Sequence, residues 1–124
     1  MNKLSLIELL EFINDSINII RKRFQNVKTI DDFLNNDNGL EKLDSIILRI
    51  QTIGEALKNI DKHHKNFLEK IAPTEYWSNI IKLRDLISHH YIDINAEIIY
   101  MICNEKLEEL QQKILKLLKI AKNK

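Results

Sequence analysis

Residues 4–25 read LSLIELLEFINDSINIIRKRFQ, and the apolar side chains of this stretch recur at spacings of three and four residues. Each residue of an α-helix advances by about 100°, so this spacing places them on one face of a helix. That face is expected to consist of Leu6, Leu10, Ile13, Ile17, Ile20 and Phe24. A long helix with one apolar side must bury that side, and the stretch therefore predicts packing against other helices.

Three further stretches repeat the pattern. One helix is predicted to end near Ile60, the next to begin at Thr74 behind Pro73, and the last to begin at Asp93 or Asn95. Their inward faces are expected to be, in order, Leu40, Leu43, Ile47, Ile50, Gly54 and Leu57; Ile80, Leu83 and Ile87; and Ile99, Ile102, Leu110, Ile114, Leu117 and Ala121. A glycine inside a helix costs about 1 kcal/mol against alanine, so Gly54 is expected where another helix approaches closely.

Short segments connect the helices. Residues 35–39 (NNDNG) are predicted to form a loop, and Thr29 with Asp32 resembles a capping box that starts a short helix over residues 30–34. Residues 61–72 are expected to be a further helical piece. The sequence contains no internal repeat and no sustained alternation typical of strands. These features predict an all-α, up-and-down bundle of four or five helices that forms a single domain over residues 1–124.

Composition limits the classes of function. The formal net charge is +1, which is not the broad basic excess of a general nucleic-acid coat protein. Two basic clusters stand out, over residues 58–65 and 113–124, and each fits either a phosphate-binding surface or an ordinary solvated helix face. The single cysteine, Cys103, fits a reducing compartment, and neither a secretory signal nor a membrane span is apparent, so a cytoplasmic protein is expected.

The segment RDLISHHY, residues 84–91, contains most of the chemistry of the chain. Arg84 and Tyr91 share one helix face with Ser88 between them, whereas His89 lies roughly 140° around the helix from Arg84. One helix therefore makes at best a loose Arg/His site, but two chains related by a two-fold axis bring two such sets into one cleft. Asp85 precedes His89 by four residues and is placed to orient its imidazole.

Arginine and histidine together suit the cleavage of RNA. RNA carries its own nucleophile, the 2′-hydroxyl, so cleavage needs a base, an acid and a cation for the developing charge. His89 fits the first two roles and Arg84 the third. Carboxylates and histidines do not cluster at the spacing of metal ligands, so neither a metal site nor a cofactor is predicted.

Several motifs together resemble a known family. Arg84-x4-His89-x-Tyr91 is similar to the signature of HEPN-domain proteins, specifically the HepT-like toxins of HEPN/MNT toxin–antitoxin pairs. The elements IGEA (residues 53–56), Pro73 with Trp77, and YIDI (residues 91–94) also resemble this family, in the same order. The resemblance covers about residues 4–118, and the combination is more specific than any one motif.

The resemblance implies a homodimer in which two Arg-x4-His motifs line a cleft at the interface. It implies metal-independent endoribonuclease activity, with Arg84 and His89 catalytic and Asp85 at the family's polar position. It also implies a minimal nucleotidyltransferase (MNT) antitoxin, which in some systems transfers AMP to the motif tyrosine, here Tyr91. A nucleotide phosphate near Arg84 would compete with RNA for the same cation.

Two alternatives stay open at the level of sequence. In the first alternative, the protein is a non-catalytic helical binding partner of a nucleotidyltransferase, which the long apolar stripes and near-neutral charge favour. Alternatively it is a plain dimeric bundle, in which Arg84 makes a surface ion pair and the residues from His89 to Tyr91 cap the end of a helix.

Overall fold

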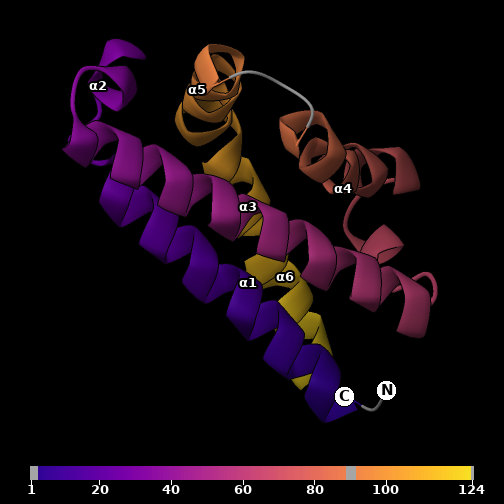
Figure 1. The fold of residues 1–124 in the computed structure, drawn as a ribbon. Coiled ribbons are helices and arrows are strands. Elements are labelled where there is room, and N and C mark those ends of the chain that lie inside the picture. Colours follow the sequence, from indigo (N-terminus) through magenta and orange to yellow (C-terminus); the bar gives the residue numbers. More distant parts are fainter. Residues whose placement is uncertain (1–2, 89–91, 124) are drawn as a thin grey trace.

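The computed structural model describes residues 3–88 and 92–123, and this part of the chain is helical with short turns and without strands. The long helices α1 (Lys3–Phe24) and α3 (Asp37–His63) lie side by side and run in opposite directions (Figure 1). Helix α6 (Leu107–Lys122) packs along α1, and α4 (Thr74–Ser88) packs on α3. The predicted all-α, up-and-down bundle is confirmed. No helix in the described ranges is long and apolar enough to span a membrane.

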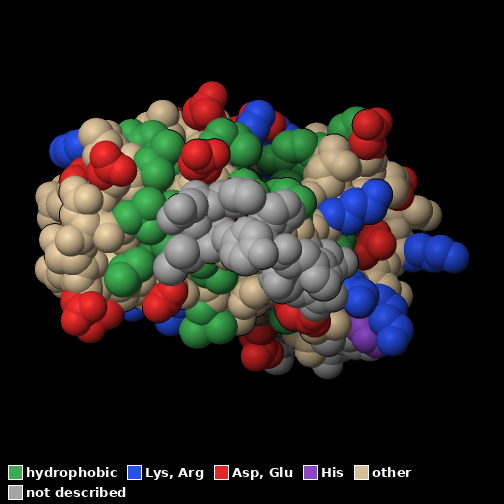
Figure 2. Space-filling view, turned by 45° about the horizontal axis from the view of Figure 1, so that its top comes forward, with side chains coloured by type: hydrophobic (Ala, Val, Ile, Leu, Met, Phe, Trp, Pro, Cys, Tyr) green, Lys and Arg blue, Asp and Glu red, His purple; other side chains and the backbone are tan. Residues whose placement is uncertain are grey.

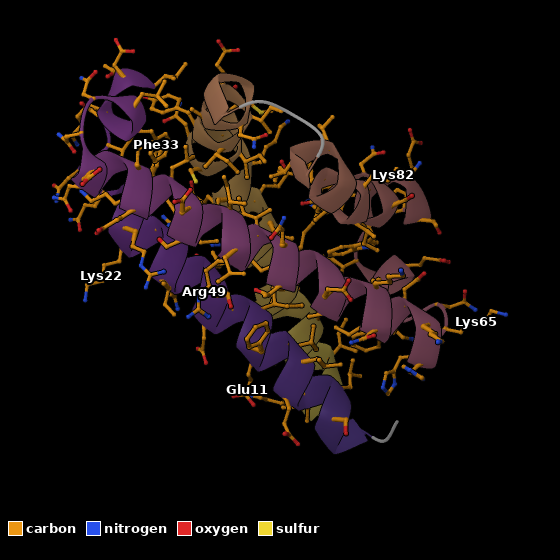
Figure 3. The ribbon with its side chains drawn as sticks, viewed as in Figure 1. Glu11, Lys22, Phe33, Arg49, Lys65 and Lys82 are labelled. Carbon is orange, nitrogen blue, oxygen red and sulfur yellow. The ribbon has the colours of Figure 1, made fainter. Side chains whose placement is uncertain are left out.

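Helix α1 buries the face that its spacing predicts. Leu6, Leu10, Ile13, Ile17 and Ile20 are buried, and the Phe24 ring lies near the rings of Phe33 and Tyr100. Phe33 comes from the short helix α2 (Asp31–Leu34), which lies at one end of the molecule (Figure 3). The stripe on α3 is confirmed in most positions: Leu40 and Ile47 are only half-buried, and Ile46 and Ile53 join its buried face.

The corner between α2 and α3 is tighter than predicted. Residues 35–39 are not a loop, because α3 already begins at Asp37 and the Asn36 side chain caps it by accepting a hydrogen bond from Gly39 N at 2.8 Å. A Cβ at position 39 would overlap the backbone carbonyl oxygen of Asp32, so the corner requires glycine. The predicted capping carboxylate is present, since Asp32 Oδ2 accepts from Thr29 N at 3.0 Å and Lys28 N at 2.7 Å.

The prediction of one helical piece over residues 61–72 is wrong. Helix α3 continues to His63, and Asn66 then adopts a left-handed backbone conformation with φ of 67°. A left-handed residue ends a right-handed helix, so only the short 3₁₀ turn η1 (Leu68–Lys70) follows. Phe67 and Leu68 are nevertheless buried in the core. His64, expected at the surface, is half-buried, and burial lowers the pKa of its imidazole.

The predicted last helix contains a π-helical turn. Helix α5 (Ile92–Met101) continues through the turn η2 (Ile102–Lys106) into α6. The Leu107 N–H bonds the Ile102 carbonyl five residues earlier, which is the π pattern. Five residues of α-helix would rotate Leu107 by roughly 140° from Ile102, whereas a π turn returns it near the same side. Ile102 and Leu107 are both buried. The extra residue in the π turn therefore keeps the buried faces of α5 and α6 on the same side of the core.

A buried polar cluster fixes α6 against α1. Gln111 is 8% exposed, and its amide donates to Asn18 Oδ1 at 2.7 Å and Asn14 Oδ1 at 3.0 Å. Arg21 Nη1 in turn donates to Gln111 Oε1 at 2.7 Å. Because hydrogen bonds have strict geometry, these contacts specify how the two helices align along their length.

Candidate functional site

Helix α4 is the element that positions the motif. It begins at Thr74 behind Pro73, as predicted, and the Thr74 hydroxyl donates to Glu69 Oε1 at 2.7 Å. Trp77 is 2% exposed, and its indole N–H bonds the carbonyls of Leu68 at 2.9 Å and Ala72 at 3.1 Å. These hydrogen bonds hold the start of α4 against η1. Ile87 is buried and anchors the other end of the helix.

The structure describes the backbone of the motif up to Ser88. Arg84, Asp85 and Ser88 lie in the last turns of α4, and the structure does not describe their side chains. His89 and Tyr91 lie outside the described residues, between the end of α4 and the start of α5 (Figure 1). The relative placement of the Arg84 and His89 side chains therefore stays a prediction, as do the supporting roles of Asp85 and Ser88.

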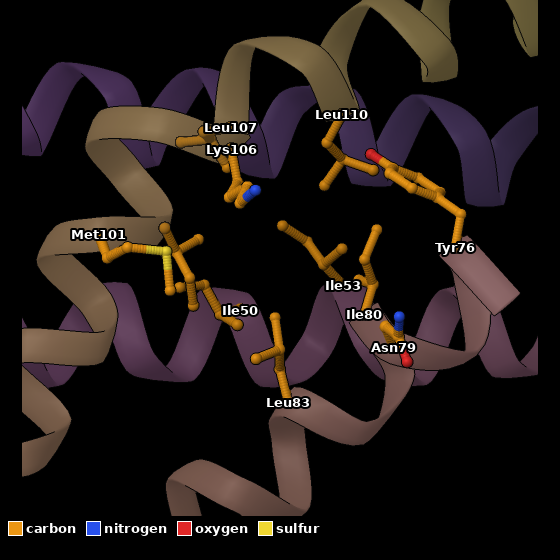
Figure 4. Close-up of a pocket in the computed structure, with 11 residues that line it drawn as sticks. Ile50, Ile53, Tyr76, Asn79, Ile80, Leu83, Met101, Lys106, Leu107 and Leu110 are labelled. Atoms are coloured by element: carbon orange, nitrogen blue, oxygen red, sulfur yellow. The ribbon is translucent and has the colours of Figure 1, made fainter. Parts of the chain in front are cut away.

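A mostly apolar pocket lies on the side of α4 that faces η2 and α6. Its volume is about 270 Å³, and Ile80 and Leu83, predicted as core residues of α4, are half-buried at its wall (Figure 4). The remaining lining residues are Ile50, Ile53, Tyr76, Asn79, Met101, Ile102, Lys106, Leu107 and Leu110. Met101 is 38% exposed and Leu86, near the end of α4, is 42% exposed. Two large apolar side chains are thus exposed, Leu86 within the motif segment of α4 and Met101 at the pocket.

Hydrophobic side chains also border the undescribed residues on the face shown in Figure 2. Lysine and arginine side chains gather at the right-hand end of this face, where a histidine lies as well. In Figure 1 this end is the region where α3 ends and α4 begins. Sequence reasoning missed this arrangement, because it depends on which helices pack together and not on any local pattern.

Replacing Trp77 by Phe tests the anchor of α4. The change removes a buried donor and leaves the Ala72 carbonyl without that partner, so we expect a loss of about 1–3 kcal/mol in the free energy of unfolding. Urea denaturation measures it. Tyr76→Phe is the matched control beside it, expected to change stability by no more than about 0.5 kcal/mol. Equal stability of Trp77→Phe and the wild type would show that the indole bonds do not hold this end of α4.

Cys103 is expected to be unreactive in the folded protein. The thiol is half-buried in η2, and burial raises its pKa to about 12, so the reactive thiolate is scarce at pH 8. A thiol-reactive disulfide reagent should modify it slowly at pH 8 and at once in guanidinium chloride. Fast stoichiometric reaction of the native protein would contradict this placement.

The all-α bundle is consistent with the HEPN-like class that the sequence resembles. The family model described as "Ribonuclease HepT-like" matches residues 13–117, which include all of α4 and α5. This chain belongs to the HepT-like ribonuclease family, and the resemblance drawn from its sequence is confirmed.

Curated relatives agree with this assignment. "Putative RNase MJ0127" of Methanocaldococcus jannaschii is 36% identical over 102 residues, which cover 82% of this chain and 74% of that protein. "Putative RNase TTE0752" of Caldanaerobacter subterraneus subsp. tengcongensis is 27% identical over 63% of this chain and 66% of its own length.

A longer relative carries a second activity in its name. "Gamma-glutamylcyclotransferase and putative RNase MJ0434", also of M. jannaschii, is 28% identical over 93% of this chain, which spans about half of that protein, 49%. No solved structure matches this chain significantly.

Proposed function

We propose that this protein is a metal-independent endoribonuclease with Arg84 and His89 as its catalytic pair. The observation that carries the proposal is the family match, which spans the Arg84-x4-His89-x-Tyr91 segment and the two helices that flank it. Arg84 is in the penultimate turn of α4, and Trp77 and Ile87 fix that helix on both sides of it. A rigid helix is a suitable support for a catalytic side chain.

The proposed chemistry uses the RNA 2′-hydroxyl as nucleophile. His89 accepts its proton while the oxygen attacks the adjacent phosphorus, and the bond to the 5′-oxygen of the next nucleotide breaks as that oxygen takes the proton back from His89. Arg84 stabilises the negative charge that develops on the phosphoryl oxygens. The products are a 2′,3′-cyclic phosphate and a free 5′-hydroxyl. Histidine has an ordinary pKa near 6.5, so it exchanges protons readily at neutral pH. Asp85 and Ser88 are the proposed supporting residues, Asp85 to orient the imidazole and Ser88 as a further hydrogen-bonding group.

A homodimer completes the proposed site. On an ideal α-helix the positions of Arg84 and His89 would be roughly 140° apart, which favours a cleft built from two chains. The exposed apolar side chains of Leu86 on α4 and Met101 at the end of α5 support an interface, because a second copy that covered them would remove them from water. Leu86→Glu is therefore expected to shift the protein from dimer to monomer in analytical ultracentrifugation.

In the cell the protein is proposed to act as the toxin of a toxin–antitoxin pair in the cytoplasm. An MNT antitoxin is the proposed partner, with AMP transfer to Tyr91 as the means of neutralisation. The added phosphate would place negative charge seven residues from Arg84, where it competes with RNA. Intact-mass measurement of protein co-expressed with its antitoxin would detect AMP on Tyr91, and a Tyr91→Phe variant should escape this modification.

The proposal is tested by incubating purified protein with total RNA in EDTA. We expect fragments that end in 2′,3′-cyclic phosphate and begin with 5′-hydroxyl, and no cleavage of single-stranded DNA. Intact mass must first show that Tyr91 is unmodified. Cleavage that EDTA stops and magnesium restores would contradict the proposed mechanism, and no cleavage of any RNA by folded protein would contradict the assignment as a ribonuclease.

A further inference from the structure

A second cleft, lined by charged as well as apolar side chains, lies on the other side of α4 from the apolar pocket. It opens between the end of α3, the turn η1 and the start of α4, and its volume is about 280 Å³. Lys58 and Asp61 line it from α3, and Ser78 and Lys82 line it from α4, one helical turn apart. Leu68, Trp77 and Ile81 form its floor, and Glu69 and Thr74 complete its rim. Helix α4 thus separates an apolar pocket from a cleft that also carries charged side chains.

The two lysines of this cleft are available for a ligand. Lys58 and Lys82 are exposed, and neither side chain forms an ion pair or hydrogen bond with a described residue. By contrast, Lys113 in the C-terminal basic cluster lies 3.1 Å from Glu109 and Lys122 lies 3.9 Å from Glu11. The cleft therefore presents two unpartnered cations, whereas part of the C-terminal cluster is already neutralised.

The acidic groups of the cleft differ in their surroundings. The Glu69 carboxylate accepts a hydrogen bond from the Thr74 hydroxyl at 2.7 Å and is held at the rim. Asp61 lies three residues after Lys58 on the same side of α3, so it lowers the positive potential that Lys58 produces. Neutralising Asp61 should consequently strengthen the attraction of the cleft for an anion.

The cleft adjoins the motif along α4. Lys82 lies six residues before Ser88, roughly 9 Å along the helix. Figure 3 places Lys82 on α4 and Lys65 just beyond the end of α3, at the same end of the molecule. This is the end where the basic side chains gather beside the undescribed residues in Figure 2. An RNA strand that reaches the end of α4 can continue over this surface.

We infer that the cleft between α3 and α4 binds phosphates of the RNA strand next to the cleaved bond, with Lys58 and Lys82 as the phosphate-binding groups. This inference rests on the proposed function, since it names where the same substrate continues. It also assigns a role to part of the basic cluster over residues 58–65. Lysine binds phosphate as a point charge, so the cleft is expected to hold RNA without reading its sequence.

The test is equilibrium binding of a fluorescent 2′-O-methyl RNA, which resists cleavage, to the full-length protein at several salt concentrations. Each phosphate contact on a single strand contributes about 0.7 to the salt slope, so Lys58→Gln with Lys82→Gln should lower the slope by about 1.4. The same relation gives a loss of affinity of about tenfold at 0.15 M salt. Lys116→Gln with Lys119→Gln is the matched control and should leave the slope unchanged.

Asp61→Asn is the second variant, and it should tighten binding, which a general loss of structure would not do. All variants should keep the unfolding midpoint of the wild type. If RNA binds and is cleaved but the cleft variants match the control, the inference fails while the proposed function stands. If the wild-type protein binds no RNA, the proposed function fails and the inference with it.

Discussion

Replacing His89 by Ala is expected to slow RNA cleavage by about 10²–10⁴-fold, because the reaction loses the group that moves its protons. The rate should be measured under single-turnover conditions in EDTA, so that neither product release nor a contaminating metal-dependent nuclease affects it. His90→Ala is a matched control, since it removes the same side chain from the neighbouring position. It is expected to keep most of the activity.

The pH dependence of the wild-type rate adds an independent check. A histidine with an ordinary pKa near 6.5 should produce a rate that changes between about pH 5 and 8. In His89→Ala the residual rate should lose that change. Equal rates for wild type and His89→Ala would remove His89 from the mechanism, and a large effect of His90→Ala alone would move the role to the adjacent residue.

Replacing Arg84 by Gln is expected to lower the cleavage rate by about 10²–10³-fold, the size of effect seen when one stabilising donor is removed from a transition state. Arg84→Lys keeps the charge but loses the planar pair of donors, so its rate should lie between those of Arg84→Gln and the wild type. Arg49→Gln on α3 is the control for a general loss of positive charge.

Stability separates catalytic from structural roles of Arg84. A surface residue that acts in catalysis should change the free energy of unfolding by well under about 1 kcal/mol. If Arg84→Gln is inactive but also melts far below the wild type, the arginine is a structural residue, as in the plain-bundle alternative. If it is active and stable, Arg84 has neither role.

Helix faces could be predicted from sequence because burial follows a strict period. The predicted α1 residues from Leu6 to Ile20 are buried and Phe24 is half-buried, and the four residues predicted from Leu110 to Ala121 are all buried. Turns depend on single contacts that no period reveals. Asn36 acts as a cap within a run of polar residues that is typical of a loop, and Asn66 ends the segment after α3 through its backbone conformation. Both errors concern where helices start and end.

Some features of the candidate site could likewise be predicted from the sequence, and others could not. The motif was recognisable because its residues are close in sequence and ordered as in a family. The π turn of η2 could have been suspected from the five-residue spacing of Ile102 and Leu107, which breaks the α-helical period. The sequence could not predict that Lys58 and Lys82 line the same cleft, since this depends on how the end of α3 packs against α4.

The most direct measurement compares two RNA substrates in EDTA. The first carries a cleavage site mapped with the wild-type protein, and the second is identical except for a single 2′-deoxy nucleotide on the 5′ side of that site. We predict that the deoxy substitution abolishes cleavage at that bond and leaves cleavage elsewhere unchanged, because the attacking hydroxyl is missing. Cleavage of both substrates at the same bond and rate would contradict the claim that this protein cuts RNA through its own 2′-hydroxyl.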